Sequence, residues 1–506
     1  MRAALKIIII VALLAGPAAL ADWYTGVGGN TARYARMDVQ GPTGRDLLWE
    51  GSRPAIVSQQ GCCEEDLLVV SRISSFDIPT GTWIVAHELE TGAERWAVQL
   101  PYNFPDVSWR SRVSAIRDGQ VYASRSGGYS NQDYLYALDP IDGSILWESA
   151  GLISESTTES LGFAPNGDLI VGNFTSVMRI DHTDGSTVWE VPRSTPTSNG
   201  AQAAIYGNRA YVWESSAGGP MVTAFDLEHG DRLFSSEALS PGWIQQICLF
   251  CGSQGTIYAP RSMNNPDTDF FVALADTGMG FKELWRVPMG YTPFAGFAEG
   301  PDGSVYTYSP MIEVLRLDPA TGAEISRSTR LPYDSPASPR MAIDQTGTVY
   351  LTNGGFESGE LLVFTPDLEL IWSDPLTGNN LGGPVLAADG TLVVCGTGTT
   401  VRAYRSPTAA VVSTAGLRLL RPNAPNPFTT GTEIRFQLRA EDRVTLRVLD
   451  AEGRIVRHLL EGAFPIAQEV WWDGRDDQGR PAASGVYLAS LRSGGRTEVH
   501  RMILSR

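Results

Sequence analysis

Short runs of alternating apolar and polar residues, separated by turn-forming residues, make up most of the chain. The clearest example is LYALDPIDGSILWES, residues 135–149, in which two such runs flank a turn. The side chain of Asp139 can cap this turn, and Gly143 can adopt the left-handed conformation that a tight hairpin needs. Alternation on both sides predicts two half-buried strands. The stretch therefore predicts a β-hairpin.

The same hairpin pattern recurs through the first 410 residues. Related stretches lie at 85–98, 177–191, 222–236, 271–287, 314–328 and 361–374. A turn followed by a strand precedes each copy, and seven of these turns hold a glycine every 40 to 48 residues. The equivalent place in the first unit is at 63–71, which makes eight units. This period, with several short strands per unit, is typical of a β-propeller. We predict eight blades, with seven as the alternative if one irregular unit is an insertion.

A large aromatic residue recurs in the last strand of the unit. The positions are Trp96, Trp147, Trp189, Trp285 and Trp372. We expect each ring to pack between neighbouring blades, where burying it is worth about 2–3 kcal/mol. Phe234 and Ile325 fill this place in the two irregular units. The last unit lacks a fourth strand, and the stretch RDLLWEGS around Trp49 can supply it, which would close the ring and remove exposed sheet edges.

The pattern Ala-Leu-Asp-x-x-Asp/Thr-Gly-x-x-x-Trp resembles the repeat of the pyrroloquinoline-quinone-like propeller superfamily, over about residues 23–405. Some secreted enzymes of that superfamily place a ring of two neighbouring cysteines over a quinone. Cys62 and Cys63 are neighbours here. In the repeat frame they fall in a surface turn of the first blade, where they could form a vicinal disulfide or one could pair with a distant thiol. The enzymes' Asn-Arg-Gly stretch, calcium ligands and catalytic aspartate have no matching positions, so a quinone-dependent dehydrogenase is the alternative and not the expectation.

The last hundred residues read differently. After a linker at 406–417, residues 418–506 predict about seven short strands, and the alternation in VTLRVLD and GVYLASL favours an Ig-like β-sandwich. The motif residues of this region are Asn426, Pro427, Phe428, Asp450, Gly453, Trp472, Asp473, Gly474, Gly479, Gly485 and Tyr487. Together they resemble the C-terminal sorting domain of type IX secretion and the related Ig-like domain of the flagellar hook-capping protein. That resemblance implies export across an outer membrane, followed by attachment to the cell surface or release.

Charge and the N-terminus fit an exported protein. Residues 1–21 combine a basic start, an apolar stretch and a small-residue cleavage site, which predicts a secretory signal peptide. The net charge of −17 argues against binding to nucleic acid, and no second apolar run reaches membrane-spanning length. The acidic residues concentrate in the repeat region, since residues 411–506 carry 14 arginines and only 11 acidic residues.

Candidate chemistry outside the repeats is sparse. Cys248 and Cys251 lie in a predicted strand and turn, which favours a local disulfide or two buried thiols over a redox motif. The stretch MNNPDTDF is rich in oxygen ligands and could hold Ca²⁺, but a solvated loop is the preferred interpretation because its spacing is not that of an EF-hand. We therefore expect no catalytic, cofactor-binding or metal residues. The predicted function is that of an extracellular or surface-bound bacterial propeller that binds a surface protein or glycan and meets the secretion machinery through its C-terminal domain.

Overall fold

The structure is a computed structural model that describes the chain from residue 22 onward, with internal gaps. Outside the described residues lie 1–21, 52–55, 76, 78, 105–109, 127–131, 155–160, 197–202, 243–247, 266, 293–295, 335–339, 380–381, 396–400, 407–419, 421–422, 424, 438–441, 451–453, 465–466 and 494–495. The predicted signal peptide, most of the linker and Gly453 fall among them. The all-β prediction is confirmed: the described residues contain strands and turns, and no helix that could cross a membrane.

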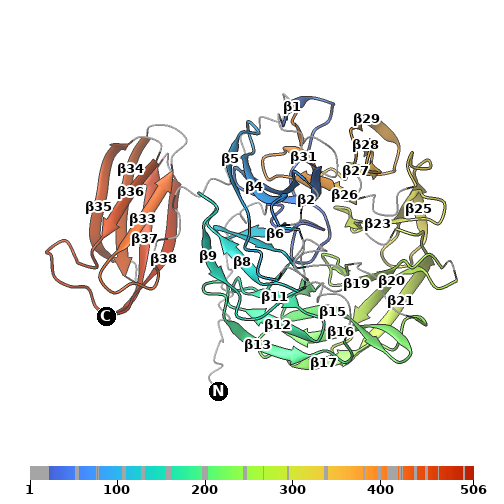
Figure 1. The fold of residues 1–506 in the computed structure, drawn as a ribbon, viewed down its shortest axis with the longest axis horizontal. Helices are drawn as coiled ribbons and strands as arrows, with labels where there is room; N and C mark the ends of the chain where they lie inside the picture. Colours follow the sequence, from blue (N-terminus) through green and yellow to red (C-terminus); the bar gives the residue numbers. More distant parts are fainter. Residues whose placement is uncertain are drawn as a thin grey trace, which may run out of the picture.

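The described residues between 47 and 404 form eight successive four-stranded antiparallel sheets, as expected of a β-propeller (Figure 1). Sheet 1 consists of β2 (Ile56–Glu64), β3 (Leu67–Ile73), β4 (Thr82–Glu88) and β5 (Glu94–Val98). Sheet 2 consists of β6 (Arg112–Arg117), β7 (Gln120–Ser124), β8 (Leu135–Leu138) and β9 (Ile145–Glu148). Sheet 3 consists of β10 (Gly162–Phe163), β11 (Leu169–Gly172), β12 (Ser176–Ile180) and β13 (Thr187–Pro192). Sheet 4 consists of β14 (Ala204–Tyr206), β15 (Arg209–Ser216), β16 (Gly219–Asp226) and β17 (Arg232–Ser235).

The next three sheets repeat this order. Sheet 5 consists of β18 (Phe250–Cys251), β19 (Ile257–Arg261), β20 (Phe270–Asp276) and β21 (Phe281–Pro288). Sheet 6 consists of β22 (Ala298–Glu299), β23 (Val305–Tyr308), β24 (Val314–Leu317) and β25 (Glu324–Arg327). Sheet 7 consists of β26 (Arg340–Ile343), β27 (Val349–Gly354), β28 (Gly359–Phe364) and β29 (Leu370–Leu376).

Sheet 8 is assembled from both ends of the repeat region. Its strands β30 (Gly383–Leu386), β31 (Leu392–Cys395) and β32 (Arg402–Tyr404) are completed by β1 (Leu47–Glu50), which pairs antiparallel with β32. The predicted closing strand around Trp49 is thus confirmed. The pairing covers a sheet edge that would otherwise be exposed.

Burial within a sheet differs from the predicted alternation. All four residues of β8 are buried, whereas β9 exposes Ile145 and Leu146 and buries Trp147. The first three strands are mostly buried because each sheet lies between two others, so that both of its faces are covered. Half-burial therefore describes only the fourth, outer strand.

The first strand of each sheet is its inner edge, and the segment 22–41, called here the axial segment, runs along these edges. One backbone N–H at or just beyond the end of each first strand donates to this segment, at 2.7–3.3 Å. The donors, called here the amide ring, are Cys63, Ile116, Phe163, Ile205, Cys251, Glu299, Ile343 and Ala388. Their acceptors run from Asp22 to Ala35 in the order of sheets 8, 1, 2 and so on to 7. The segment therefore passes all eight sheets once.

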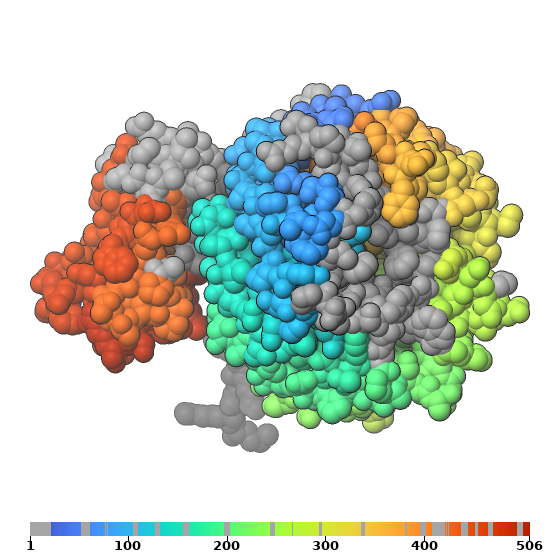
Figure 2. Space-filling model, viewed as in Figure 1, coloured from blue at the N-terminus to red at the C-terminus, as the bar shows by residue number. Residues whose placement is uncertain are grey.

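The C-terminal residues form a separate body beside the sheets, red and orange in Figure 2. A two-stranded sheet pairs β33 (Thr432–Gln437) with β36 (Ala467–Trp472), and a second sheet has the order β35 (Ile455–Phe464), β34 (Asp442–Asp450), β37 (Gly485–Ser493), β38 (Arg496–Leu504). These sheets enclose a core of their own, as a β-sandwich does. The described part of the sandwich has six strands where about seven are predicted, because Leu420 and Phe428 form only isolated bridges, to Phe436 and Leu504.

Candidate functional site

The recurring tryptophans lie at the junctions between sheets. Five indole N–H groups each donate to a backbone carbonyl in the hairpin turn of the next sheet, at 2.8–3.1 Å. These pairs are Trp49 to Leu89, Trp96 to Pro140, Trp147 to His182, Trp189 to Leu227, and Trp285 to Pro319. Trp372 makes no such bond, and its indole nitrogen lacks a partner among the described residues. Each of the five thus joins its sheet to the next one.

Asp139 and Gly143 form the turn that receives Trp96. The carboxylate of Asp139 accepts the N–H of Ile141 at 2.7 Å, and Gly143 donates its N–H to the carbonyl of Asp139 at 2.8 Å. Gly143 has a φ of +75°, and a Cβ there would lie 2.7 Å from the ring of Trp96. Glycine is thus required here for its conformation and for the close approach of the indole.

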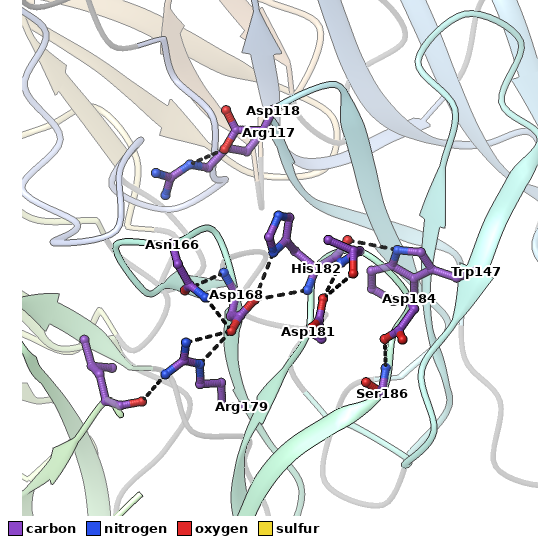
Figure 3. Close-up of polar contacts among 12 residues, drawn as sticks. Arg117, Asp118, Trp147, Asn166, Asp168, Arg179, Asp181, His182, Asp184 and Ser186 are labelled. Carbon is purple, nitrogen blue, oxygen red and sulfur yellow. Dashed lines mark hydrogen bonds and ion pairs between the residues drawn. The ribbon is translucent and has the colours of Figure 1, made fainter. Parts of the chain in front are cut away.

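A buried carboxylate, Asp168, organises a polar cluster in sheet 3 (Figure 3). It accepts hydrogen bonds from the side chain of Asn166 at 2.8 Å, from Nε of Arg179 at 2.8 Å and from Nδ1 of His182 at 2.9 Å. Arg179 also donates to the carbonyl of Leu227 in sheet 4 at 2.7 Å. The carbonyl of His182 in turn accepts the indole N–H of sheet 2, so the cluster links three sheets.

The charges of this cluster are balanced within it. Burial alone would raise the pKa of Asp168, but the hydrogen bonds from His182, Asn166 and Arg179 outweigh it and hold that pKa well below its usual range. The hydrogen bond to Asp168 raises the pKa of His182. Asp168, Asp181 and His182 hold their ligand atoms within 4.8 Å of one another, a spacing that suits a metal ion. A cation would have to compete with the guanidinium of Arg179, so we interpret the cluster as structural.

The cysteine pair lies in a strand and not in the surface turn predicted for it. Cys62 and Cys63 are the last buried residues of β2, and no disulfide joins them. The turn lies beyond them at Glu65 and Asp66. Successive side chains of a strand point to opposite faces, and the two cysteines accordingly belong to different apolar clusters. The prediction failed because SQQGCCEE has few apolar residues, although its backbone pairs with β3.

The axial segment lies beside this pair. The N–H of Cys63 donates to the carbonyl of Trp23 at 2.8 Å, and Trp23 is fully buried. Burial also strongly raises the pKa of the Cys63 thiol, and the nearby carboxyl of Asp22 adds to this. The axial segment thus lies directly beside Cys63, and burial disfavours the thiolate form of that thiol.

The other predicted clusters are also tied into the fold. Cys248 and Cys251 are free thiols, and Nη1 of Arg33 in the axial segment donates to the sulfur of Cys248 at 3.1 Å. In the stretch MNNPDTDF, the buried carboxylate of Asp269 accepts from Nη1 of Arg261 at 3.1 Å and from the N–H of Asn265 at 2.9 Å. Asp269 therefore organises its own loop.

An acidic cleft of about 550 Å³ lies between the turns of sheets 1 and 2 and the sandwich. Apolar side chains such as that of Trp147 also line it, and the sandwich contributes Pro425 and Arg435. Five carboxylates line it, against the guanidinium groups of Arg95 and Arg435: Glu64, Glu65, Asp66, Asp118 and Asp139. The excess of negative charge beside apolar side chains suits a ligand that carries cationic groups beside apolar ones.

The sandwich brings most of its motif residues to one end. Trp472 is fully buried, and its ring meets Phe428 and Tyr487 edge-on, with centroids 5.5 and 5.1 Å apart. The side chain of Asn426 accepts the N–H of Ile503 at 2.8 Å. Gly474 and Gly479 form turns with positive φ, and Asp473 caps the first of them. Gly485 begins β37, and Asp450, at the end of β34, lies opposite Tyr487 and pairs with Arg454. Motifs that are distant in sequence thus form one packed unit.

Two features of this architecture had no sequence signal that we used. Arg506 donates to the carbonyl of Gly474 at 3.0 Å and joins the chain end to the Trp472 turn. The axial segment was expected to be part of the propeller, but its place along all eight inner strands was not foreseen. Its sequence, DWYTGVGGNTARYARMDVQG, has no period that could reveal such contacts.

Comparisons with known proteins match both parts of the chain. Residues 80–245 match the family model described as outer membrane protein assembly factor BamB, and residues 423–495 match that of the FlgD Ig-like domain. No curated protein matches the chain.

Solved structures with a similar fold share little sequence. PorZ of Porphyromonas gingivalis, described as an essential bacterial surface component of the type-IX secretion system, is 14% identical with a TM-score of 0.44, over 88% of this chain and 69% of its own. BamB from Moraxella catarrhalis is 14% identical with a TM-score of 0.34, over 68% and 82%. The quinohemoprotein alcohol dehydrogenase ADHIIG from Pseudomonas putida HK5 is 11% identical with a TM-score of 0.39, over 81% and 82%. Likenesses this distant carry no argument about function.

Proposed function

We propose that this chain is a secreted or cell-surface binding or scaffold protein, in which the propeller presents binding surfaces and the C-terminal sandwich directs export by a type IX-like route. The observation that carries the proposal is the packed motif unit of the sandwich. This unit brings together Asn426, Trp472, Gly474 and Tyr487. Arg506 joins it through a hydrogen bond to the carbonyl of Gly474. The match of residues 423–495 to an Ig-like domain supports the same assignment.

The eight sheets are, in this proposal, the eight blades of one closed propeller. The first strand β2 contacts both β6 and β30, and contacts between first strands also join β10 to β14, β14 to β18, β22 to β26 and β26 to β30. The amide ring takes one donor from each sheet, in order. Both observations favour eight blades over seven.

The acidic cleft is the surface that we assign to a partner. Carboxylates beside apolar side chains attract a protein or glycan ligand that carries cationic groups. Electrostatic attraction of this kind weakens with added salt, because the Debye length falls to about 3 Å at 1 M ionic strength.

Localisation of the native protein tests the export assignment. We expect the full-length chain at the cell surface or in the medium, and a chain without residues 411–506 inside the envelope. The Trp471→Ala variant is the matched control, because this ring is 59% exposed and its loss should leave export unchanged. Thermal unfolding of the purified truncated protein establishes that its propeller is folded. A folded, truncated chain that still reaches the surface would show that the sorting assignment is wrong.

A further inference from the structure

The axial segment contacts the sheets in the way that a bound peptide contacts a receptor. It contains no strand among the described residues, yet it accepts hydrogen bonds from all eight members of the amide ring. Six of the acceptors are backbone carbonyls, and two are side-chain oxygens of Asp22 and Thr31. Peptides that bind along sheet edges use main-chain hydrogen bonds for affinity and side-chain pockets for specificity.

The backbone of the segment is strained, and contacts with the sheets help to hold it. Arg33 and Ala35 have φ values of +66° and +54°, a region that costs a residue with a side chain about 1–2 kcal/mol. The strain is held by contacts on both sides of Ala35. Its N–H donates to the carbonyl of Gly28 at 2.9 Å, and its carbonyl accepts the N–H of Ile343 at 2.9 Å. The first contact lies within the segment and the second comes from sheet 7, so this shape depends on the segment and the sheets together.

One side chain anchors the segment. Trp23 is fully buried, and its indole N–H donates to the carbonyl of Gly26 at 2.9 Å. The ring lies against Gly29, where a Cβ would come within 2.6 Å of it. The site therefore prefers a peptide with an aromatic residue at the position of Trp23 and a glycine at the position of Gly29.

The segment ends in an exposed stretch before the first strand. Thr43, Arg45 and Asp46 are exposed, and β1 begins at Leu47. The connection between the axial segment and sheet 8 is therefore open to a protease if a recognition sequence is placed there.

We propose that the amide ring is a peptide-binding site whose ligand is the chain's own axial segment, and that it recognises this segment whether or not the two are covalently joined. The inference goes beyond the proposed function and does not depend on it. The site takes a turned peptide with a Trp near its N-terminus and a Gly-Gly pair five residues later. While the segment is bound, it occupies the amide ring, so another peptide cannot bind there.

Cleavage of the folded protein tests this proposal. A protease site inserted between Gly44 and Arg45 allows the full-length protein to fold before it is cut. We expect the cut segment to remain with the sheets in gel filtration and to exchange with an isotope-labelled synthetic peptide of residues 22–44, as measured by mass spectrometry. The thermal midpoint of the cut protein should rise with added peptide, because a ligand that binds only the folded state stabilises it by mass action.

Peptide variants show whether recognition is specific. A Trp23→Ala peptide should compete about 10- to 100-fold less well, since it loses the burial of a large ring. An Asp38→Asn peptide is the matched control and should compete as the natural one does, because Asp38 is exposed. The proposal is overturned if the cut segment dissociates while the thermal midpoint stays unchanged, or if a scrambled peptide exchanges equally well.

Discussion

Five of the eight junctions between sheets are built alike, and three are not. In the five, a tryptophan donates to the turn of the next sheet, and its ring covers a glycine of that turn, where a Cβ would lie 2.5–2.7 Å from the ring. The glycines are Gly92, Gly143, Gly185, Gly230 and Gly322. Tryptophan and glycine therefore occur together, because each requires the other.

The three remaining junctions use an arginine, a tyrosine and an aspartate. Between sheets 4 and 5, Arg209 and Tyr211 contact Asp276. Between sheets 6 and 7, Arg316 pairs with Asp367 of the next turn at 2.5 Å. The hydroxyl of Tyr306 donates to the carbonyl of Pro366 there, at 2.9 Å.

The third of these junctions, between sheets 7 and 8, explains the unpartnered indole of Trp372. Sheet 8 has no hairpin turn between its third and fourth strands, because its fourth strand comes from the N-terminal end. Asp374 instead accepts the hydroxyl of Tyr404 at 2.6 Å and lies 3.4 Å from Arg402. Where sheet 8 lacks the hairpin turn that would receive the indole of Trp372, contacts of Asp374 join the two sheets instead.

The largest effect is expected where a tryptophan junction is removed. Trp96→Ala should lower the free energy of unfolding by about 3–5 kcal/mol, because a nearly buried ring is lost and a cavity remains. Ile325 holds the same place in sheet 6 but is 48% exposed, so Ile325→Ala should cost about 1 kcal/mol or less. Urea unfolding of both variants measures the difference. Equal losses would contradict the division into two kinds of junction.

The second-largest loss in the free energy of unfolding is expected at the charged junction between sheets 7 and 8. Asp374→Asn leaves Arg402 and Arg45 without their buried carboxylate and should cost about 2–3 kcal/mol. Asp334→Asn is the control, because Asp334 pairs with Arg330 at the exposed surface, where a pair is worth about 0–1 kcal/mol. Both variants are compared by urea unfolding at the same ionic strength. A loss at Asp374 no larger than that at Asp334 would mean that this junction is held by apolar packing alone.

A glycine substitution separates steric overlap from backbone strain. Gly143→Ala meets both a positive φ and the ring of Trp96, and should cost about 2–3 kcal/mol. Gly278 has a φ of +85° with nothing within 4 Å of an added Cβ, so Gly278→Ala should cost only about 1 kcal/mol. Thermal unfolding of the two variants gives the comparison. If both lose the same stability, the tryptophan does not require a bare glycine.

These junctions also show what the sequence could predict. The Asp-x-x-x-Gly turn and the tryptophan are local and periodic, so the hairpins, the repeats and the closing strand around Trp49 were predictable. The cysteine pair was misplaced, because β2 has a polar sequence and is a strand only through its pairing with β3. The axial segment and Arg506 act through contacts between distant residues, and such contacts leave no local pattern. In the sandwich, the motif residues were predictable, but their convergence on Trp472 was not.

The junction of sheets 8 and 1 is also bridged from the inside by Asp22, whose carboxylate accepts from the N–H groups of Ala388 and Glu65. Burial raises its pKa to about 7, and the hydrogen bond from Glu65 opposes that rise only in part. The folded state therefore holds the proton more tightly than the unfolded state. The stability that this gives is fully present below about pH 4 and is lost as the pH rises through about 7.

Asp22→Asn should remove this loss. The comparison uses protein in which Ala21 still precedes residue 22, so that residue 22 carries no free amino group. At pH 8 we expect the free energy of unfolding of the variant to exceed that of the natural chain by about 1–2 kcal/mol, and at pH 4 we expect no gain. Urea unfolding at the two pH values measures this. A variant that gains nothing at pH 8 would show that the carboxylate is well accommodated in its charged form.

The smallest effect is expected at His182, beside the Trp147 junction. Its pKa is raised by the hydrogen bond to Asp168, so protonated His182 stabilises the fold below the unfolded pKa of about 6.5, and this contribution disappears as the pH rises through the higher folded value. Because its side chain is 27% exposed, we expect about 1 kcal/mol or less. His182→Gln should reduce the change in stability between pH 6 and pH 8. His229→Gln is the control, since that side chain is 68% exposed and its pair with Asp226 is looser, at 3.3 Å. If the two variants change the pH dependence equally, Asp168 does not hold the imidazolium, and the cluster contributes to this junction only through the backbone carbonyl that receives Trp147.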